Sequence, residues 1–180
     1  MTAIAGDRLI PSLAAQTPEP CAPGTFNPYT GAGPCLLAPP GTYVTKTGAT
    51  SPIDCPAGTA NPNSGSSSIS ACVTTPAGTY AEAGSAEPTD CVAGIYNPNV
   101  GSTSLSNCIL APAGTYVSTA AATECPVGTY NPDVGSASLN DCILAPAVTY
   151  VSTTGAASAT DCPFGTFSPA AGATSVGDCL

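Results

Sequence analysis

Residues 125–142 read CPVGTYNPDVGSASLNDC, and this stretch decides the architecture because its pattern recurs along the whole chain. The opening motif, C-P-x-G-T-Y, recurs in five places with its leading cysteine: at 21–26, 55–60, 91–96, 125–130 and 162–167. Four sister motifs with Ala or Thr in place of that cysteine start at 38, 75, 111 and 145. The chain is therefore a tandem repeat in which cysteine-bearing A halves alternate with cysteine-free B halves.

Each A half continues with the same turn residues. Asn-Pro follows the aromatic residue, as at 97–98 and 131–132, and glycine comes three residues later, at Gly101 and Gly135. Asn and Pro favour the first two positions of a type I turn, and the glycine supplies a positive φ. The pattern predicts small hairpins in which the aromatic residue and an apolar residue pack on a disulfide. The apolar residues, three positions before the closing cysteine, are Ile69, Leu105, Leu139 and Val176.

The composition argues against a single large core. The 180 residues include 10 Cys, 20 Pro and 19 Gly, with no His and no Trp. Large apolar side chains are sparse, and no amphipathic stripe of helical period occurs. An even number of cysteines, without His and without a CxxC motif, indicates disulfides and hence an oxidising compartment, extracellular or at the cell surface.

The charge excludes several classes of partner. The net charge is −9, and Arg8 and Lys46 are the two basic residues. Nucleic-acid binding and docking to anionic lipid both need basic surfaces. No apolar run of 18 residues occurs, so we expect no membrane insertion. Residues 1–20 lack the features of a signal peptide, so we expect that a leader was removed or that the chain is a piece of a longer product.

The pattern C-P-x-G-T-Y … G … C-x-x-C-P-x-G-T-Y resembles the ephrin-receptor-like cysteine-rich repeat, over residues 21–180. That family occurs in receptor ectodomains and large cell-surface proteins, so the resemblance implies a small, disulfide-rich extracellular module. In the family pattern every half has an opening and a closing cysteine, whereas the B halves here have neither. The opening positions hold Ala38, Thr75, Ala111 and Ala145, and the closing positions hold Pro52, Pro88, Ala122 and Ala159.

This paired loss implies, within the family pattern, that the two cysteines of one half are bonded to each other. The bonds that the resemblance implies are Cys21–Cys35, Cys55–Cys72, Cys91–Cys108, Cys125–Cys142 and Cys162–Cys179. Each closes a loop of about 15 residues and contributes roughly 3 kcal/mol in the chain-entropy model. The B halves, without such bonds, must be held by their neighbours. We expect their tyrosines and the apolar pairs before them (Leu36-Leu37, Ile109-Leu110 and Ile143-Leu144) to hold them.

The predicted fold is a small, disulfide-rich, all-β or irregular structure: a linear array of about nine short β-hairpin half-units. The half-units start at residues 21, 38, 55, 75, 91, 111, 125, 145 and 162. A β-solenoid is the alternative, because 17–20 residues could form one short rung. The proline content argues against it, since proline interrupts continuous ladders.

Neither a catalytic site nor a bound cofactor is expected. Without histidine there is no Ser-His or Cys-His pair, and six acidic residues recur directly before a cysteine, which suggests a structural role: Asp54, Asp90, Glu124, Asp141, Asp161 and Asp178. Asn131, Asp133 and Asp141 could offer oxygen ligands to calcium. The equivalent turns at 61–63 and 97–99 carry no carboxylate, so we interpret these residues as turn residues and expect no metal site.

Glycosylation is expected to be O-linked if it occurs. No Asn-x-Ser/Thr sequon is present, and the exposed hydroxyl candidates lie in Ser64–Ser68 and in the Val-Ser-Thr runs at 117–119 and 151–153. Plain polar turn residues are the alternative interpretation.

Residues 1–20 form an N-terminal extension with the length of one B half, and Ala3 and Gly6 are spaced like Ala38 and Gly41. Our hypothesis is that this segment docks as a degenerate B half on the last A half of another copy, which would give a head-to-tail filament. We therefore expect an extracellular structural protein of a fibre, stalk or filament. A receptor or adhesin ectodomain that binds a protein or glycan ligand is the alternative, and Tyr29, outside the repeat pattern, is its candidate contact residue.

Overall fold

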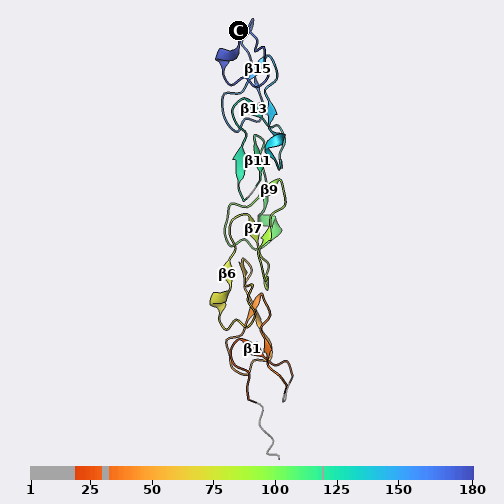
Figure 1. The fold of residues 1–180 in the computed structure, drawn as a ribbon, viewed down its shortest axis with the longest axis vertical. Coiled ribbons are helices and arrows are strands. Elements are labelled where there is room, and N and C mark those ends of the chain that lie inside the picture. Colours follow the sequence, from red (N-terminus) through yellow and green to blue (C-terminus); the bar gives the residue numbers. More distant parts are fainter. Residues whose placement is uncertain (1–18, 30–32, 119) are drawn as a thin grey trace, which may run out of the picture.

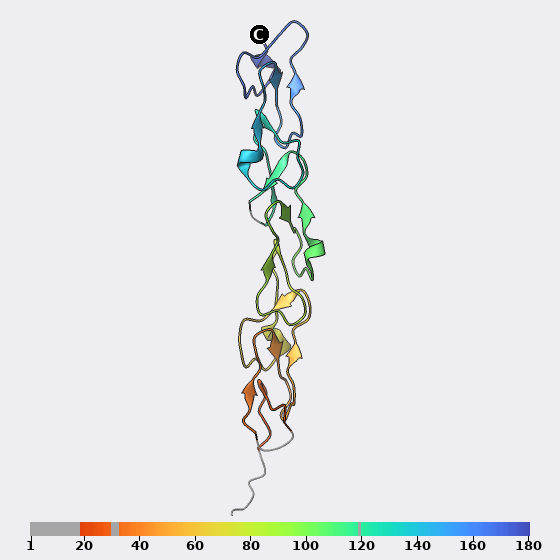
Figure 2. The same ribbon diagram turned by 90° about the vertical axis from the view of Figure 1, so that its right-hand side faces the viewer.

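The chain is an elongated rod in the computed structural model, which describes residues 19–29, 33–118 and 120–180 (Figures 1 and 2). The half-units follow one another along the rod axis in the order of the sequence. The N-terminal extension, apart from Glu19 and Pro20, lies outside the described residues.

Regular structure in the described part of the chain consists mainly of eight two-stranded antiparallel sheets in series. The first strand of each sheet comes from the motif, and the second lies just before the next half-unit. The pairs are β1 (Thr25–Phe26) with β2 (Leu36–Leu37), β3 (Thr42–Tyr43) with β4 (Ile53–Asp54), β5 (Thr59–Ala60) with β6 (Val73–Thr74), β7 (Thr79–Tyr80) with β8 (Thr89–Asp90), β9 (Ile95–Tyr96) with β10 (Ile109–Leu110), β11 (Thr115–Val117) with β12 (Ala122–Glu124), β13 (Thr129–Tyr130) with β14 (Ile143–Leu144), and β15 (Thr149–Tyr150) with β16 (Thr160–Asp161).

The two ends of the last A half are also paired by backbone hydrogen bonds, although they are too short to count as strands. The backbone amide of Phe167 donates to the carbonyl of Leu180 (3.1 Å), and the amide of Leu180 donates to the carbonyl of Phe167 (2.9 Å). The observed architecture is therefore the expected linear array of hairpin half-units, not the alternative β-solenoid.

The turns of the A halves at 55, 91 and 125 form as the sequence predicts. In the A half at 91, the Oδ1 of Asn97 accepts a hydrogen bond from the backbone amide of Asn99 (3.1 Å). Gly101 then leaves the turn with a φ of +69°. This left-handed conformation is open to glycine without steric cost, which explains why glycine stands there.

Four short 3₁₀ helices precede the closing cysteines. They are η1 (Ile69–Ala71), η2 (Leu105–Asn107), η3 (Leu139–Asp141) and η4 (Val176–Asp178). The apolar residue that begins each helix keeps about half of its surface in water; Leu105 and Leu139 are 50% and 51% exposed. The expected packing of these side chains on the disulfides therefore covers them only in part.

The apolar pairs before the B halves are only partly covered, and their role in holding those halves stays a prediction. They are the strands β2, β10 and β14 of the preceding A hairpins, and their side chains are exposed. Because each pair bonds its own hairpin partner, its side chains lie at the rod surface.

Two columns of small residues make up much of the narrow core instead. One column holds the first residue of the motif, which is buried in seven half-units at Cys21, Ala38, Cys55, Thr75, Ala111, Cys125 and Ala145. The other holds the residue after the aromatic position, buried at Val44, Asn61, Ala81, Asn97, Val117, Asn131, Val151 and Ser168. Because the positions of the first column are buried in a narrow core, the small side chains of Cys, Ala and Thr can replace one another there.

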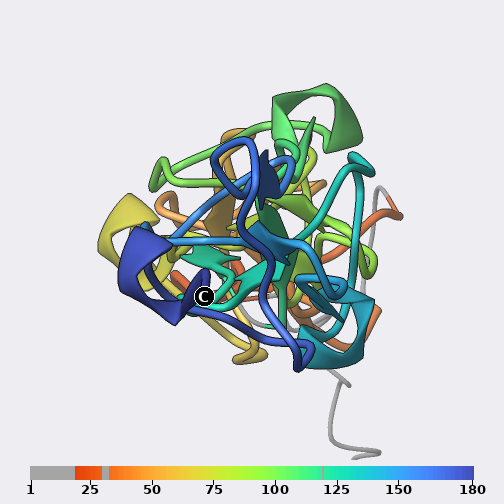
Figure 3. The same cartoon turned by 90° about the horizontal axis from the view of Figure 1, so that it is seen from above.

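Successive A halves present their helices to different sides of the rod. Viewed along the axis, η1, η2 and η3 point in three directions, and η4 returns to the side of η1 (Figure 3). The repeat is therefore a screw, and equivalent surfaces lie on one side at every third A half.

Candidate functional site

The faces between half-units are the most regular feature of the rod, and three backbone hydrogen bonds define them. Between the half-units at 55 and 75, the amide of Gly58 donates to the carbonyl of Ala81 (2.8 Å), and that of Asn61 to Ser85 (3.2 Å). In return, the amide of the turn residue Gly84 donates to the carbonyl of Cys55 (2.9 Å). The same three bonds form at seven of the eight steps between half-units; the exception is the step from 91 to 111.

Buried asparagines add a side-chain bond to these faces in three A halves. The Nδ2 atoms of Asn61, Asn97 and Asn131 donate to the carbonyls of Thr42, Thr79 and Thr115 in the preceding B halves, at 3.0, 2.9 and 2.9 Å. The asparagines are essentially inaccessible to solvent.

Sequence reasoning identified these asparagines as turn residues and missed this second role. The signal that could have revealed it is their register: the B halves hold Val44, Ala81 and Val117 at the same position. A polar residue in an otherwise apolar column indicates a buried hydrogen bond.

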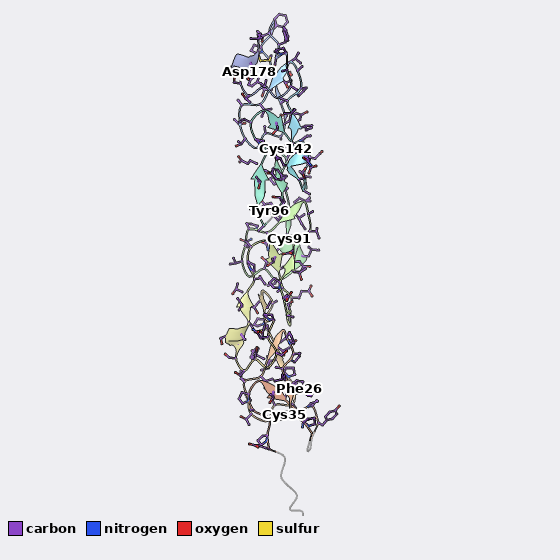
Figure 4. All side chains as sticks on the ribbon, viewed as in Figure 1. Phe26, Cys35, Cys91, Tyr96, Cys142 and Asp178 are labelled. Atoms are coloured by element: carbon purple, nitrogen blue, oxygen red, sulfur yellow. A yellow bond between two sulfur atoms is a disulfide. The ribbon has the colours of Figure 1, made fainter. Side chains whose placement is uncertain are left out.

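Five disulfides follow one another along the rod; Cys35, Cys91 and Cys142 mark three of them in Figure 4. The pairs are Cys21–Cys35, Cys55–Cys72, Cys91–Cys108, Cys125–Cys142 and Cys162–Cys179, with Cα–Cα distances between 5.6 and 5.9 Å. They coincide with the pairs that the family pattern implies, and each links the two ends of one A half.

Asp141 and Asp178, two of the acidic residues before a cysteine, each cap a 3₁₀ helix. A carboxylate oxygen of Asp141 accepts from the amides of Ala137 and Ser138, both at 3.0 Å, and so closes the capping box of η3. Asp178 does the same at η4, where the amides of Thr174 and Ser175 hold its pKa below the usual value.

The calcium candidates are not brought together as a metal site. Asn131 uses its side chain within the rod, where its Oδ1 accepts from the amide of Asp133 (3.1 Å). Asp141 caps a helix, as described above. Among residues 19–29, 33–118 and 120–180, no three Cys, Asp or Glu side chains are grouped so that they could hold a metal ion.

Several grooves open on the described surface. One of about 480 Å³ lies between the half-units at 91 and 111, and another of about 480 Å³ is formed by the last A half. A smaller groove of about 190 Å³ lies beside Tyr29, whose side chain is 74% exposed. These three grooves thus lie at the irregular step, at the end of the array and at the candidate contact residue.

The last A half carries the same bonding groups as its predecessors, and here they are open. The amides of Gly165 and Ser168 and the carbonyl of Cys162 are equivalent to the groups of Gly58, Asn61 and Cys55. In the described part of the chain none of the three has a hydrogen-bond partner. No atom lies within 4 Å of the place where a Cβ on Gly165 would stand, whereas at Gly58 a carbonyl oxygen lies 2.3 Å away.

A sequence model for the family described as tyrosine-protein kinase ephrin type A/B receptor-like matches residues 24–72 and 114–162, just over half of the chain. The first match contains the whole B half at 38 and most of the A halves on either side of it, and the second contains the whole A half at 125, the whole B half at 145 and most of the B half at 111. No curated protein matches the chain significantly. Within the described residues there is no helix of the length and apolar character needed to cross a bilayer.

Proposed function

Because the chain belongs to the ephrin-receptor-like family, whose disulfide-rich repeats are typical of extracellular domains, we propose that it is an extracellular structural protein without enzymatic activity. Its copies join head to tail into a fibre, stalk or filament. The rod shape supports this proposal, because nearly uniform half-units bonded through their backbones give length and stiffness (Figure 1).

The observation that carries the proposal is the set of unbonded groups on the last A half of the described residues, which fits a further half-unit from whichever chain supplies it. Gly165, Ser168 and Cys162 present two donors and one acceptor in the arrangement that holds the next half-unit at seven other steps. A half-unit supplied by a second copy can complete the same three bonds. Because the contact joins two different ends of the molecule, it does not form a closed oligomer. Each added copy leaves a free end for the next one, so a filament grows.

Apolar surface at the same end supports the docking of a protein segment. The side chains of Phe164, Phe167 and Leu180 are exposed, and the groove of about 480 Å³ is lined in part by Leu180. Burial of such surface is favourable by roughly 25 cal/mol per Å² before the entropic cost of association.

The proposed occupant is the segment 1–20 of a second copy, used as a degenerate B half. Two features of the segment support this assignment. Its length is that of one B half, and Ala3 and Gly6 are spaced like Ala38 and Gly41. Residues 1–18 lie outside the described residues, so this part of the proposal depends on sequence alone.

Electron microscopy of the unreduced protein tests the assembly. We expect long fibres from the full chain and single short rods after deletion of residues 1–20. The deletion leaves all five disulfides in place, so unchanged circular dichroism and free-thiol content serve as the control. Separate rods from the full chain, or fibres that persist after the deletion, would contradict the proposal.

We also propose O-linked glycans on the rod surface. Ser64, Ser67, Ser68, Ser118 and Ser152 are exposed and lie in turns or loops, where a modifying enzyme can reach them. Mass spectrometry of natively isolated protein should find hexose-type additions on peptides that contain these residues, and unmodified peptides would argue against the proposal.

A receptor or adhesin ectodomain is the second candidate, favoured by the groove beside Tyr29. Glu19, Asn27 and Tyr29 contribute to its lining, and exposed tyrosines often carry binding energy. If a ligand is found, Tyr29→Ala should weaken its binding by about tenfold or more, whereas replacement of the repeat residue Tyr80 should act on stability. Equal affinity after Tyr29→Ala would remove this candidate site.

A further inference from the structure

One step of the rod lacks the bonds that hold all the others. Between the half-units 91–110 and 111–124, the amides of Gly94 and Asn97 and the carbonyl of Cys91 have no hydrogen-bond partner within the described residues. What remains of the backbone pattern is the bond from the amide of Ala111 to the carbonyl of Gly94 (3.0 Å). The irregularity affects a single step, since the steps on both sides of it are complete.

The sequence of the following B half explains the loss. The half-unit 111–124 has 14 residues, whereas the other B halves have 16 or 17, and it lacks the turn glycine. Its hairpin closes early: β11 and β12 form three residue pairs, ending with Val117 opposite Ala122, instead of two. The turn that should reach back to the preceding A half is therefore too short.

Two features of the neighbouring half-units reflect the shorter turn, the exposure of a cysteine and a groove. Cys91 is partly exposed, whereas its equivalents Cys55 and Cys125 are completely buried by the turns of the half-units that follow them. A groove of about 480 Å³ lies at the same place, between the acidic side chain of Asp90 and the strand residue Val117.

Two of the unpaired amides at this step belong to buried residues. Gly94 and Asn97 are buried, and their amides have no hydrogen-bond partner among the described residues. Unpaired buried donors are rare in folded proteins because each lowers stability. A movement that opens this step breaks one backbone bond between half-units, from Ala111 to Gly94, whereas every other step would lose four.

From these observations we infer that the rod has one joint, at the step between 91–110 and 111–124, about which its two stiff segments bend. The groove beside the joint supplies the space for bending. Local opening is expected where the free energy that holds adjacent units together is lowest. This inference does not depend on head-to-tail assembly.

Distances between equivalent turn residues test the joint. Asn63, Asn99, Asp133 and Ala170 are exposed and occupy the same place in four successive A halves. Spin labels on non-canonical amino acids at 99 and 133 span the joint, and labels at 63 and 99 span an intact step as the matched control. Electron spin resonance should give a distance distribution at least about twofold broader across the joint. Equal widths would overturn the inference.

A turn graft tests the cause. Replacing residues 118–123 with a copy of residues 152–160 restores the turn length and the glycine of the B half at 145. We expect the 99–133 distribution to narrow to that of the control pair, and the amides of Gly94 and Asn97 to exchange about tenfold more slowly. No change in either quantity, in a graft that forms all five disulfides, would overturn the inference.

The reciprocal graft keeps the test informative if the first variant does not fold. Replacing residues 152–160 with a copy of 118–123 should create a second joint and broaden the distribution between labels at 133 and 170 about twofold. An unchanged width there would show that turn length does not determine bending, and would contradict the inference.

Discussion

Glycine at the fourth position of the motif serves two purposes that can be separated by comparing Gly58 with Gly165. Both have a left-handed φ, of +85° and +87°. A Cβ at Gly58 would lie 2.3 Å from the carbonyl oxygen of Gly101, two half-units further on, whereas at Gly165 it would meet nothing within 4 Å. The close approach of two backbones, in addition to the φ angle, therefore requires glycine at position 58.

We predict different costs for the same substitution at these two sites. Gly165→Ala should lower the free energy of unfolding by about 1 kcal/mol, the cost of a left-handed alanine. Gly58→Ala should cost at least about 2 kcal/mol more, because the backbone of the half-unit at 91 must move. Denaturant unfolding under oxidising conditions measures both, and equal costs would contradict the role assigned to the close approach.

Val148 supports the role of the close backbone approach in requiring glycine. It occupies the glycine position of the B half at 145 with a φ of +71°, which is unusual for a β-branched residue. Its side chain is 54% exposed. Steric freedom at this place, late in the array, is what allows a side chain to replace the glycine.

At the scale of elements, three of the four 3₁₀ helices in the described residues have a side-chain acceptor at their third residue. Asn107, Asp141 and Asp178 fill that position in η2, η3 and η4. In η2 the Oδ1 of Asn107 accepts from the amides of Thr103 and Ser104, both at 3.2 Å, so a neutral amide can replace the carboxylate. The acidic residues at this position are therefore interchangeable with asparagine as caps.

Asp178 makes η4 sensitive to acid. The amides of Thr174 and Ser175 lower its pKa below the usual value of 3.8. A lowered pKa in the folded state stabilises the cap at pH values above the ordinary pKa, and this contribution is lost as the pH falls through the lowered one. We predict that the amide NMR shifts of residues 174 and 175 titrate below pH 3.8 and that Asp178→Asn removes the titration. Shifts that stay constant on acidification would contradict this prediction.

The sequence revealed those features that depend on the identity of side chains. The cysteine-bearing and cysteine-free halves and the positions of the turns follow from repeated residues, and the family pattern implied the five disulfides. The contacts between half-units could not be predicted, because backbone amides and carbonyls leave almost no signature in the sequence. The exposure of Leu36-Leu37 could not be predicted either, because an apolar pair predicts burial and nothing in it shows that it forms a strand within its own hairpin.

At the scale of the whole molecule, net charge and exposed apolar surface have opposite effects on the association of rods side by side. The chain has a net charge of −9, and exposed aliphatic residues such as Leu110 and Leu144 recur on different sides of the rod. Like charges keep rods apart in dilute salt, whereas salt reduces that repulsion and leaves apolar attraction largely intact.

We therefore predict that rods associate side by side as salt is added. Raising the ionic strength from about 10 mM to about 1 M shortens the screening length from roughly 30 Å to roughly 3 Å. Small-angle X-ray scattering should show an increase in cross-section, with the far-ultraviolet circular dichroism unchanged. A cross-section that stays constant, or shrinks, would show that repulsion does not limit lateral contact.

The placement of the disulfides determines how the rod responds to tension. A pull on its two ends passes across each bond from opening to closing cysteine, over a Cα–Cα distance of less than 6 Å, and bypasses the residues between them. Those residues add nothing to the contour length. The B halves have no such bypass, so they unravel first and act as short compliant segments between five inextensible links.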